Sequence, residues 1–302
     1  MGDKAFCACA VSILTRTMEM LTLRNVVLTD SDFRKISELV YEHCGINLHT
    51  GKKELVRARL AKRLRQGSFR TFSEYMKHVL EDTTGKEFSI LIDSLSTNLT
   101  SFFREGQHFE FLQNKFLPSL LDRKRAKRDF RIRAWSAGCS SGEEPYSVAI
   151  TLLDSVAGQG RWDVKVLATD ISTSVLDVAR TGIYDKRRVQ PVSPMQRQRY
   201  FRISRDENEK IFEVNKSLRD VVIFKYLNLM KNWPIDTQHG GLDFIFCRNV
   251  MIYFDKPTQS RLVSRFWDIL ASGGILFTGH SESLTGIEHR FRYVQPTIYA
   301  KP

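Results

Sequence analysis

The sequence has little cysteine, and its cysteines form no recognisable disulfide or metal-binding pattern. The five residues Cys7, Cys9, Cys44, Cys139 and Cys247 are odd in number and scattered along the chain. No Cys-x-x-Cys pair is present, and no histidine lies at zinc spacing from them. We therefore expect neither a disulfide framework nor a structural metal. This usage is typical of a reducing compartment, which predicts a cytoplasmic protein.

Long hydrophobic runs are also missing. The longest strongly apolar stretch near the N-terminus covers residues 5–14, whereas a membrane-spanning helix needs about twenty residues. We therefore expect no insertion into a membrane. Hydrophobic residues make up 42% and charged residues 26% of the 302 positions, as in folded globular proteins. Residues 1–22 precede the organised pattern and are expected to be a disordered extension.

Positive charge exceeds negative charge. The chain has 46 Lys and Arg residues against 34 Asp and Glu, which gives a net charge of +12. Such an excess favours a polyanionic partner, namely a nucleic acid, an anionic membrane surface or an acidic protein. Charge alone does not choose among these partners.

The first third of the organised chain has the periodicity of helices. Residues 29–32 can cap a helix whose following apolar positions recur at spacings of three and four. Similar patterns predict helices over residues 52–65, 71–80 and 86–92. A small all-α N-terminal domain over residues 23–95 follows from these patterns.

From about residue 130, short β-rich runs alternate with segments of helix length. This alternation predicts an α/β domain over residues 96–302, built on a parallel sheet with helices on both faces. Runs at 201–203 and 211–214, joined by a polar turn, predict a small antiparallel β insertion at about 190–220. The expected strands of the main sheet are 130–135, 164–168, 221–224, 244–247 and 274–278, followed by a hairpin at 293–294 and 297–299.

A turn of small residues follows the first expected strand. Residues 135–147 read Trp-Ser-Ala-Gly-Cys-Ser-Ser-Gly-Glu-Glu-Pro-Tyr-Ser. In open α/β sheets, ligands bind at the carboxyl ends of the strands, and small residues let a ligand approach the backbone. The adjacent Glu143 and Glu144 differ from a pyrophosphate-binding Gly-x-Gly-x-x-Gly turn and suit a cationic or hydroxyl-bearing ligand. The alternative is an ordinary turn whose acids favour the N-terminal end of the helix dipole.

The second expected strand is followed by an acid, Asp170. In dinucleotide-binding folds, an acid at this place hydrogen-bonds the ribose hydroxyls. The order of strand, small-residue turn, helix, strand and acid therefore predicts a nucleoside site without a phosphate site. S-adenosylmethionine (SAM) fits this description, because its sulfonium and amino groups tolerate nearby carboxylates.

Four segments, residues 97–104, 137–147, 168–171 and 246–254, together resemble the CheR family of chemotaxis receptor glutamate methyltransferases. The resemblance extends over about residues 25–302. It implies a Rossmann-like SAM-dependent methyltransferase domain with a small antiparallel β insertion, preceded by a small all-α domain. It further implies methyl transfer from SAM to the γ-carboxylate of specific glutamates on a methyl-accepting chemotaxis receptor, for signalling adaptation.

The resemblance also implies the site residues. Direct displacement of the methyl group needs no general base and no metal, because a carboxylate is ionised at pH 7 and a sulfonium is a strong electrophile. Arg104 and Tyr253 would lie nearest the transferred methyl group as catalytic residues, with Arg104 orienting the acceptor carboxylate through bidentate pairing. The structural alternatives are a helix-capping Arg104 and a core aromatic Tyr253. The implied cofactor-binding residues are Asn98, Thr100, Arg104, Glu144, Asp170, Asn228, Leu229, Arg248 and Asn249.

Other reactive residue types in these motifs are interpreted as structural. His280 follows the fifth expected strand, but the displacement needs no base. Cys139 and Cys247 have no neighbouring histidine in the sequence to activate them, so both are expected to be small packing residues.

A basic stripe is predicted on the second helix, where Lys52, Arg59 and Arg63 share one side with Lys62 beside them. The opposite, buried face would contain residues 56, 60 and 64. A charged face is commonly only solvated, but the resemblance implies that this stripe docks on the acidic methylation helices of the receptor. The β insertion resembles a subdomain that in some family members binds a C-terminal receptor peptide by strand addition, and this role stays open.

Two other functions compete with this prediction. A nucleic-acid methyltransferase would use the positive charge, but such enzymes carry Asn/Asp-Pro-Pro-Tyr/Phe after the fourth strand, where this chain has Cys-Arg-Asn-Val-Met-Ile-Tyr at 247–253. A SAM-binding adaptor without catalysis is disfavoured by the presence of Arg104 and Tyr253. We expect no nucleic-acid partner and a monomer.

Overall fold

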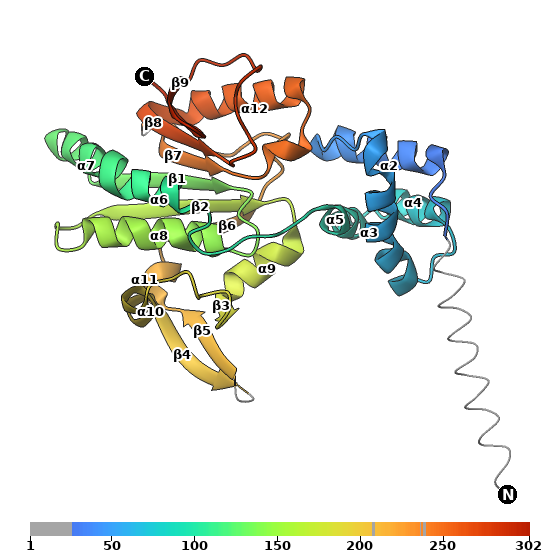
Figure 1. Cartoon of the computed structure of the whole chain (residues 1–302), viewed down its shortest axis with the longest axis horizontal. Coiled ribbons are helices and arrows are strands. Elements are labelled where there is room, and N and C mark those ends of the chain that lie inside the picture. Colours follow the sequence, from blue (N-terminus) through green and yellow to red (C-terminus); the bar gives the residue numbers. More distant parts are fainter. Residues whose placement is uncertain (1–25, 207–208, 236, 238–239) are drawn as a thin grey trace, which may run out of the picture. The chain divides into compact units, whose positions relative to one another are not determined.

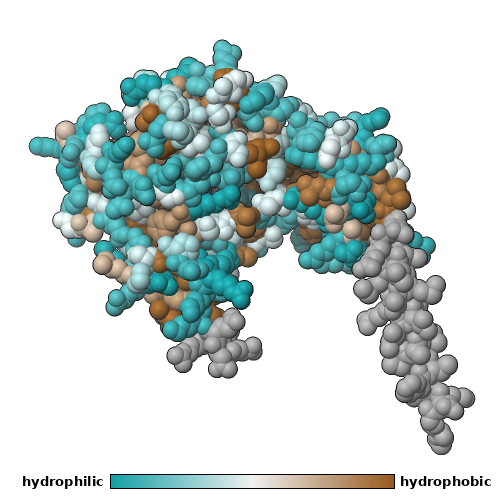
Figure 2. Space-filling model, in the orientation of Figure 1, coloured by the Kyte–Doolittle hydropathy of each residue, from teal (hydrophilic) through white to brown (hydrophobic). Residues whose placement is uncertain are grey.

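The computed structural model describes residues 26–302, apart from 207, 208, 236, 238 and 239. The expected extension over residues 1–22 lies outside this range. The chain divides into two units between Ser96 and Thr97, a helical unit and an α/β unit (Figure 1). Among the described residues, no helix is long and apolar enough to cross a membrane. Polar residues predominate on the face drawn in Figure 2.

The helical unit forms the helices that the sequence periodicity predicts. The side chain of Thr29 accepts a hydrogen bond from the Asp32 N–H and so caps the first helix, while Thr71 caps the helix of residues 72–81 in the same way. Gly45, in a left-handed conformation with φ of 73°, ends the first helix. The elements are α2 (Asp30–Cys44), η2 (Thr50–Lys52), α3 (Lys53–Gln66), α4 (Phe72–Glu81) and α5 (Lys86–Leu95).

The buried face predicted for α3 is confirmed, since Val56, Leu60 and Leu64 are each 1% exposed or less. The basic side of the helix departs from a simple surface stripe. The guanidinium of Arg63 donates from Nε and Nη2 to the two carboxylate oxygens of Glu87 on α5, at 2.6 Å each.

Three further cations belong to the predicted stripe. Arg59 donates to the carbonyl of Leu95, also on α5. Lys52 lies in the η2 turn before the helix, and Lys62 is exposed. Two members of the stripe, Arg59 and Arg63, therefore join α3 to α5 inside the unit.

The large sheet has the parallel arrangement expected from the alternating pattern. Its strand order is β6-β2-β1-β7-β8-β10-β9, with β6, β2, β1, β7 and β8 parallel and the final hairpin antiparallel. The strands are β1 (Arg131–Ala137), β2 (Asp163–Asp170), β6 (Val222–Tyr226), β7 (Leu242–Cys247), β8 (Leu270–Thr278), β9 (Arg292–Gln295) and β10 (Ile298–Ala300).

Helices cover both faces of this sheet, as predicted. On one face, Phe244 of β7 packs edge-on against Phe116, and Phe246 packs against Phe109. On the other face, Trp135 of β1 packs edge-on against Phe266 of α12. The first face is covered by α6 (Gly106–Phe111), η3 (Leu112–Phe116), α7 (Leu117–Ala126), α8 (Glu143–Val156) and α9 (Thr173–Thr181), and the second by α12 (Lys256–Ile269).

A small antiparallel sheet is inserted after α9 and projects away from the large sheet (Figure 1). It begins earlier in the chain than the expected range of about 190–220, because Tyr184 pairs with Phe212 and so adds a third strand. A three-residue strand is too short to give a periodic signal in the sequence. The elements are β3 (Ile183–Asp185), α10 (Pro194–Tyr200), β4 (Phe201–Asp206), β5 (Glu209–Val214) and α11 (Lys216–Arg219).

Candidate active site

The turn between β1 and α8 depends on two glycines in conformations that other residues rarely adopt. Gly138 has φ of 94° and Gly142 has φ of 97°. A Cβ atom on Gly138 would lie 2.3 Å from Cγ2 of Val250, and one on Gly142 would lie 2.7 Å from the Tyr184 hydroxyl. The turn is therefore packed between the loop after β7 and the small sheet.

Asp170, at the end of β2, holds this turn in place. Its Oδ2 accepts a hydrogen bond from the Ser140 N–H at 2.8 Å, and its Oδ1 accepts one from the Ser172 N–H at 2.9 Å. The Ser140 hydroxyl donates to the carbonyl of Asn98 at 3.0 Å. These bonds hold the segment around Asn98, the turn and the end of β2 against one another. Three of the four sequence motifs, residues 97–104, 137–147 and 168–171, therefore meet here.

The fourth motif contributes Arg248, whose side chain is only 1% exposed. Its Nη1 lies 3.3 Å from Oε2 of Glu144, and its Nη2 lies 3.0 Å from Oε2 of Glu105. Ser136 donates to the other Glu144 oxygen at 2.7 Å. Burial raises the pKa of Glu144 although Arg248 acts to lower it. A buried cluster of charges thus joins β1, α8 and the loop after β7.

Arg104 is held from two sides. Its Nη1 donates to the carbonyl of Leu99 at 2.6 Å, and its Nη2 donates to Oδ1 of Asn249 at 3.2 Å. Both acceptors lie in loop segments, outside the helices and strands of the unit. Tyr253 is half-buried, and its hydroxyl accepts the N–H of Thr97 at 3.4 Å. Both residues predicted to be catalytic therefore lie where the segments 97–104 and 249–253 meet.

The remaining predicted cofactor residues lie along the same edge. Tyr226 of β6 pairs with Asp170 of β2, so Asn228 follows two residues beyond that pair. Asn228 accepts the N–H of Met230 at 2.9 Å, and the next residue, Leu229, is buried. Thr100, half-buried, lies in the segment 97–104 with Asn98. The fold thus brings the predicted cofactor residues to the carboxyl edge of the sheet.

Two acids that the sequence did not single out organise this edge. Glu282 is 5% exposed and accepts the N–H groups of Asn249 and Gly279 at 2.6 Å each. Glu105 has a left-handed backbone with φ of 57° and accepts from Arg248. Glu105 directly follows the predicted site residue Arg104, whereas Glu282 is distant in the sequence from the predicted site residues, so only the three-dimensional contacts reveal the roles of both acids.

The pKa values of these two acids are shifted in opposite directions. Burial raises the pKa of Glu282, outweighing the backbone N–H bonds that lower it. For Glu105, burial acts to raise the pKa, but Arg248 and Asn249 together hold it below its ordinary value. Glu105 is therefore an anion at neutral pH.

Cys139 and Cys247 behave as packing residues. Both are fully buried, and burial raises the pKa of each thiol well above its ordinary value. Together with Cys44, they carry free thiols.

The parallel sheet, with the predicted cofactor residues at its carboxyl edge, is the arrangement of a SAM-dependent methyltransferase, and the comparison with family models agrees. Residues 98–300 match the family model described as "CheR methyltransferase, SAM binding domain", and residues 31–96 match "CheR methyltransferase, all-alpha domain". The chain belongs to the CheR methyltransferase family.

Curated relatives match over most of their length. A "Chemotaxis protein methyltransferase" of Escherichia coli (strain K12) is 42% identical over 277 residues, covering 91% of this chain and 92% of the relative. One of Borreliella burgdorferi is 40% identical over 279 residues, covering 92% and 96%. A "Chemotaxis protein methyltransferase 2" of Pseudomonas aeruginosa is 41% identical over 275 residues, covering 90% and 93%.

The residues at the edge fit the charge of SAM. The acidic side chains of Glu105, Glu144, Asp170 and Glu282 outnumber the guanidinium groups of Arg104 and Arg248, although burial raises the pKa of Glu144 and of Glu282. Acidic side chains that can pair with cations or accept hydrogen bonds suit a cofactor with sulfonium and ammonium groups and disfavour a phosphate-bearing one.

Proposed function

We propose that this enzyme transfers a methyl group from SAM to the γ-carboxylate of specific glutamates on the cytoplasmic domains of bacterial chemoreceptors, forming glutamate methyl esters. The observation that supports this most is the placement of Arg104. Its guanidinium is fixed by Leu99 and Asn249 at the edge where the family's cofactor motifs meet. The names of the relatives, chemotaxis protein methyltransferases, support the receptor as the acceptor.

The chemistry requires positioning more than activation. When bound, SAM supplies an electrophilic methyl group on a positively charged sulfur. A glutamate carboxylate is ionised at pH 7, so one of its oxygens forms the new bond to carbon while the carbon–sulfur bond breaks and its electron pair stays on sulfur. No proton moves, and no general base or metal is needed for this step.

Arg104 is proposed to orient the acceptor carboxylate, since a guanidinium pairs with a carboxylate in a fixed bidentate geometry. It already spans two segments, so its planar group is held before the acceptor arrives, which lowers the entropic cost of alignment. Tyr253, in the segment that contacts Thr97, is proposed to hydrogen-bond the same carboxylate or the cofactor.

The remaining residues are proposed to bind the cofactor. Asp170 is proposed to hydrogen-bond the ribose hydroxyls from the end of β2. Glu144 and the buried Arg248, which are paired with each other, would place charged groups beside the amino-acid part of SAM. The other proposed cofactor-binding residues are Asn98, Thr100, Arg104, Asn228, Leu229 and Asn249.

The helical unit is proposed to dock on the methylation helices of the receptor in the cytoplasm. Exposed Lys62 is the member of the predicted stripe best placed for this contact, because Arg63 is already paired with Glu87. The enzyme is proposed to act as a monomer. Binding of a receptor C-terminal peptide at the small sheet remains a prediction from the family resemblance.

The experiment is to incubate the purified enzyme with methyl-labelled SAM and receptor-containing membranes from its own source, and then to test for methanol released by alkali. Volatile label from a receptor band is the expected result. Label in nucleic acid tested in parallel would favour a nucleic-acid methyltransferase, and SAM binding without transfer would favour an adaptor.

The variant Arg104→Ala tests the orienting role. We expect turnover to fall about 100-fold at saturating SAM and receptor, the cost of removing one preorganised charged donor. Arg104→Lys keeps the charge without the bidentate fork, so it should restore only part of the rate. Near wild-type turnover in Arg104→Ala would disprove the role.

A further inference from the structure

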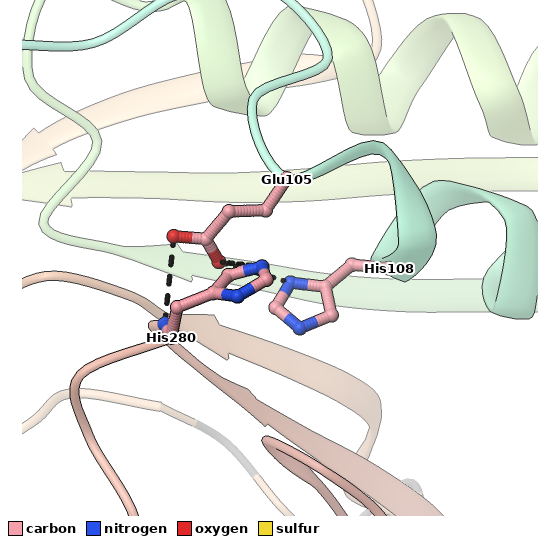
Figure 3. Close-up of side chains that lie close together, drawn as sticks. All are labelled: Glu105, His108 and His280. Carbon is pink, nitrogen blue, oxygen red and sulfur yellow. Dashed lines mark hydrogen bonds and ion pairs between the residues drawn. The ribbon is translucent and has the colours of Figure 1, made fainter.

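Beside the proposed methyl-transfer site lies a cluster of three side chains that the proposed chemistry does not use. Glu105 precedes α6, His108 lies in the first turn of α6, and His280 follows β8 (Figure 3). We propose that Glu105, His108 and His280 bind a divalent transition-metal ion such as Zn²⁺ through three protein ligands, with water in the fourth position.

The distances between the donor atoms fit such an ion. Nδ1 of His108 lies 3.5 Å from Oε2 of Glu105, and Nε2 of His280 lies 3.6 Å from the same oxygen. The donor atoms of the three residues all lie within 4.8 Å of one another. Ligand atoms about 2.1 Å from a tetrahedral zinc ion are about 3.4 Å apart. The distances from Oε2 of Glu105 to the two histidine nitrogens are therefore already close to the required length.

His108 gives an independent sign that a ligand belongs here. It is 2% exposed, and its Nδ1 has no hydrogen-bond partner within the described part of the chain. Its Nε2 lies 2.7 Å from the hydroxyl oxygen of Thr297, and that hydroxyl donates its single proton to the carbonyl of Pro296 at 2.6 Å. Nε2 of His108 is therefore the nitrogen that carries the proton, and Nδ1 presents a lone pair.

A buried lone pair that faces a carboxylate oxygen is unfavourable unless a cation or a proton lies between them. A metal ion at this position would satisfy both groups at once. The hydrogen bond from Nε2 of His108 to Thr297 is also the outer contact that metal-ligating histidines commonly make, because it fixes the tautomer and the orientation of the ring.

The cluster is both anchored and accessible. Glu105 is oriented by Arg248, whose Nη2 lies 3.0 Å from Oε2 and whose Nη1 lies 3.3 Å from Glu144, so its positive charge is shared between two carboxylates. Oε2 of Glu105 keeps a second lone pair for the ion. The side chain of His280 is 55% exposed, which opens the site to solvent. Two imidazoles and one carboxylate favour zinc-like ions over calcium or magnesium.

The test titrates the metal-stripped full chain with Co²⁺, without SAM, and records the visible absorption and the stoichiometry. The key variant is His280→Ala, because an exposed side chain can be removed without disturbing the fold. The matched control is His78→Ala. His78 is 51% exposed and lies 3.8 Å from Glu87, but it belongs to no three-ligand cluster among the described residues.

We expect one Co²⁺ per chain, with the absorption of a four-coordinate nitrogen and oxygen site, and displacement by Zn²⁺. The dissociation constant should rise at least 10-fold in His280→Ala and stay unchanged in His78→Ala. Equal affinity in wild type and His280→Ala would overturn the proposal. So would the absence of saturable binding, or a sulfur-to-cobalt charge-transfer band, which would assign the metal to cysteines.

Discussion

Replacing Arg63 by alanine tests whether the basic side of α3 serves stability or docking. The two nitrogen–oxygen contacts between Arg63 and Glu87 are 2.6 Å long, and the two side chains are 18% and 7% exposed. Arg63→Ala leaves the Glu87 carboxylate buried without its main partner. Removing one member of a buried ion pair costs about 3–5 kcal/mol, and the nearby His78, at 3.8 Å, favours the lower end of that range.

The assay exploits the distribution of tryptophan. All four tryptophans, at positions 135, 162, 233 and 267, lie in the α/β unit, so their fluorescence follows that unit alone. Hydrogen exchange of amides in α3 and α5 follows the helical unit. With a loss of about 3 kcal/mol and an m value of about 1.5 kcal/mol/M in urea, the unfolding midpoint of the helical unit should fall by about 2 M. The fluorescence midpoint should not move.

Two further variants make the reasoning refutable. Lys62→Ala, an exposed neighbour on the same helix, should leave both midpoints unchanged while weakening receptor binding. The double variant Arg63→Met with Glu87→Leu should regain most of the lost stability, since it leaves no unpaired buried charge. If Arg63→Ala is as stable as Lys62→Ala, or the double variant is no more stable than Arg63→Ala, the structural role of the pair is refuted.

Three other predictions follow from the α/β unit. Asp170→Ala should raise the dissociation constant of SAM at least 10-fold in calorimetry, because a charge-assisted hydrogen bond contributes about 1.5–3 kcal/mol; unchanged affinity would contradict the ribose role. Gly142→Ala should lower the fluorescence-monitored urea midpoint, since its φ of 97° is strained for alanine and its Cβ would lie 2.7 Å from the Tyr184 hydroxyl; a wild-type midpoint would show that the turn adapts. Although burial opposes it, Arg131 and Lys124 hold the pKa of Asp129 at about 2, below its ordinary value of about 3.9 in an unfolded chain. The stability that Asp129 contributes should therefore be complete above about pH 4 and lost as the pH falls towards 2. The urea unfolding midpoints of wild type and Asp129→Asn, followed by fluorescence, should accordingly converge over that interval.

The sequence alone predicted the features that depend on local pattern. Periodicity identified the helices of the N-terminal unit and the strands of the large sheet, because burial of one helical face or of whole strands leaves a regular trace. The small-residue turn and Asp170 could be assigned to one site, since the carboxyl ends of neighbouring parallel strands meet at one edge. The family resemblance was equally accessible, because its motifs are contiguous.

Only the tertiary structure decided which charged residues meet. Arg63 and Glu87 are 24 positions apart, and nothing local distinguishes Arg63 from the exposed Lys62 beside it. The same holds for Glu105 and His280, because the His280 backbone N–H donates to the Glu105 carboxylate across 175 positions. Charged side chains have no periodic requirement, so their partners are fixed by the packing of the elements that carry them. The sequence therefore determined the fold and the edge that carries the site, while the packing of that fold determined which charges are paired, buried or left open to a ligand.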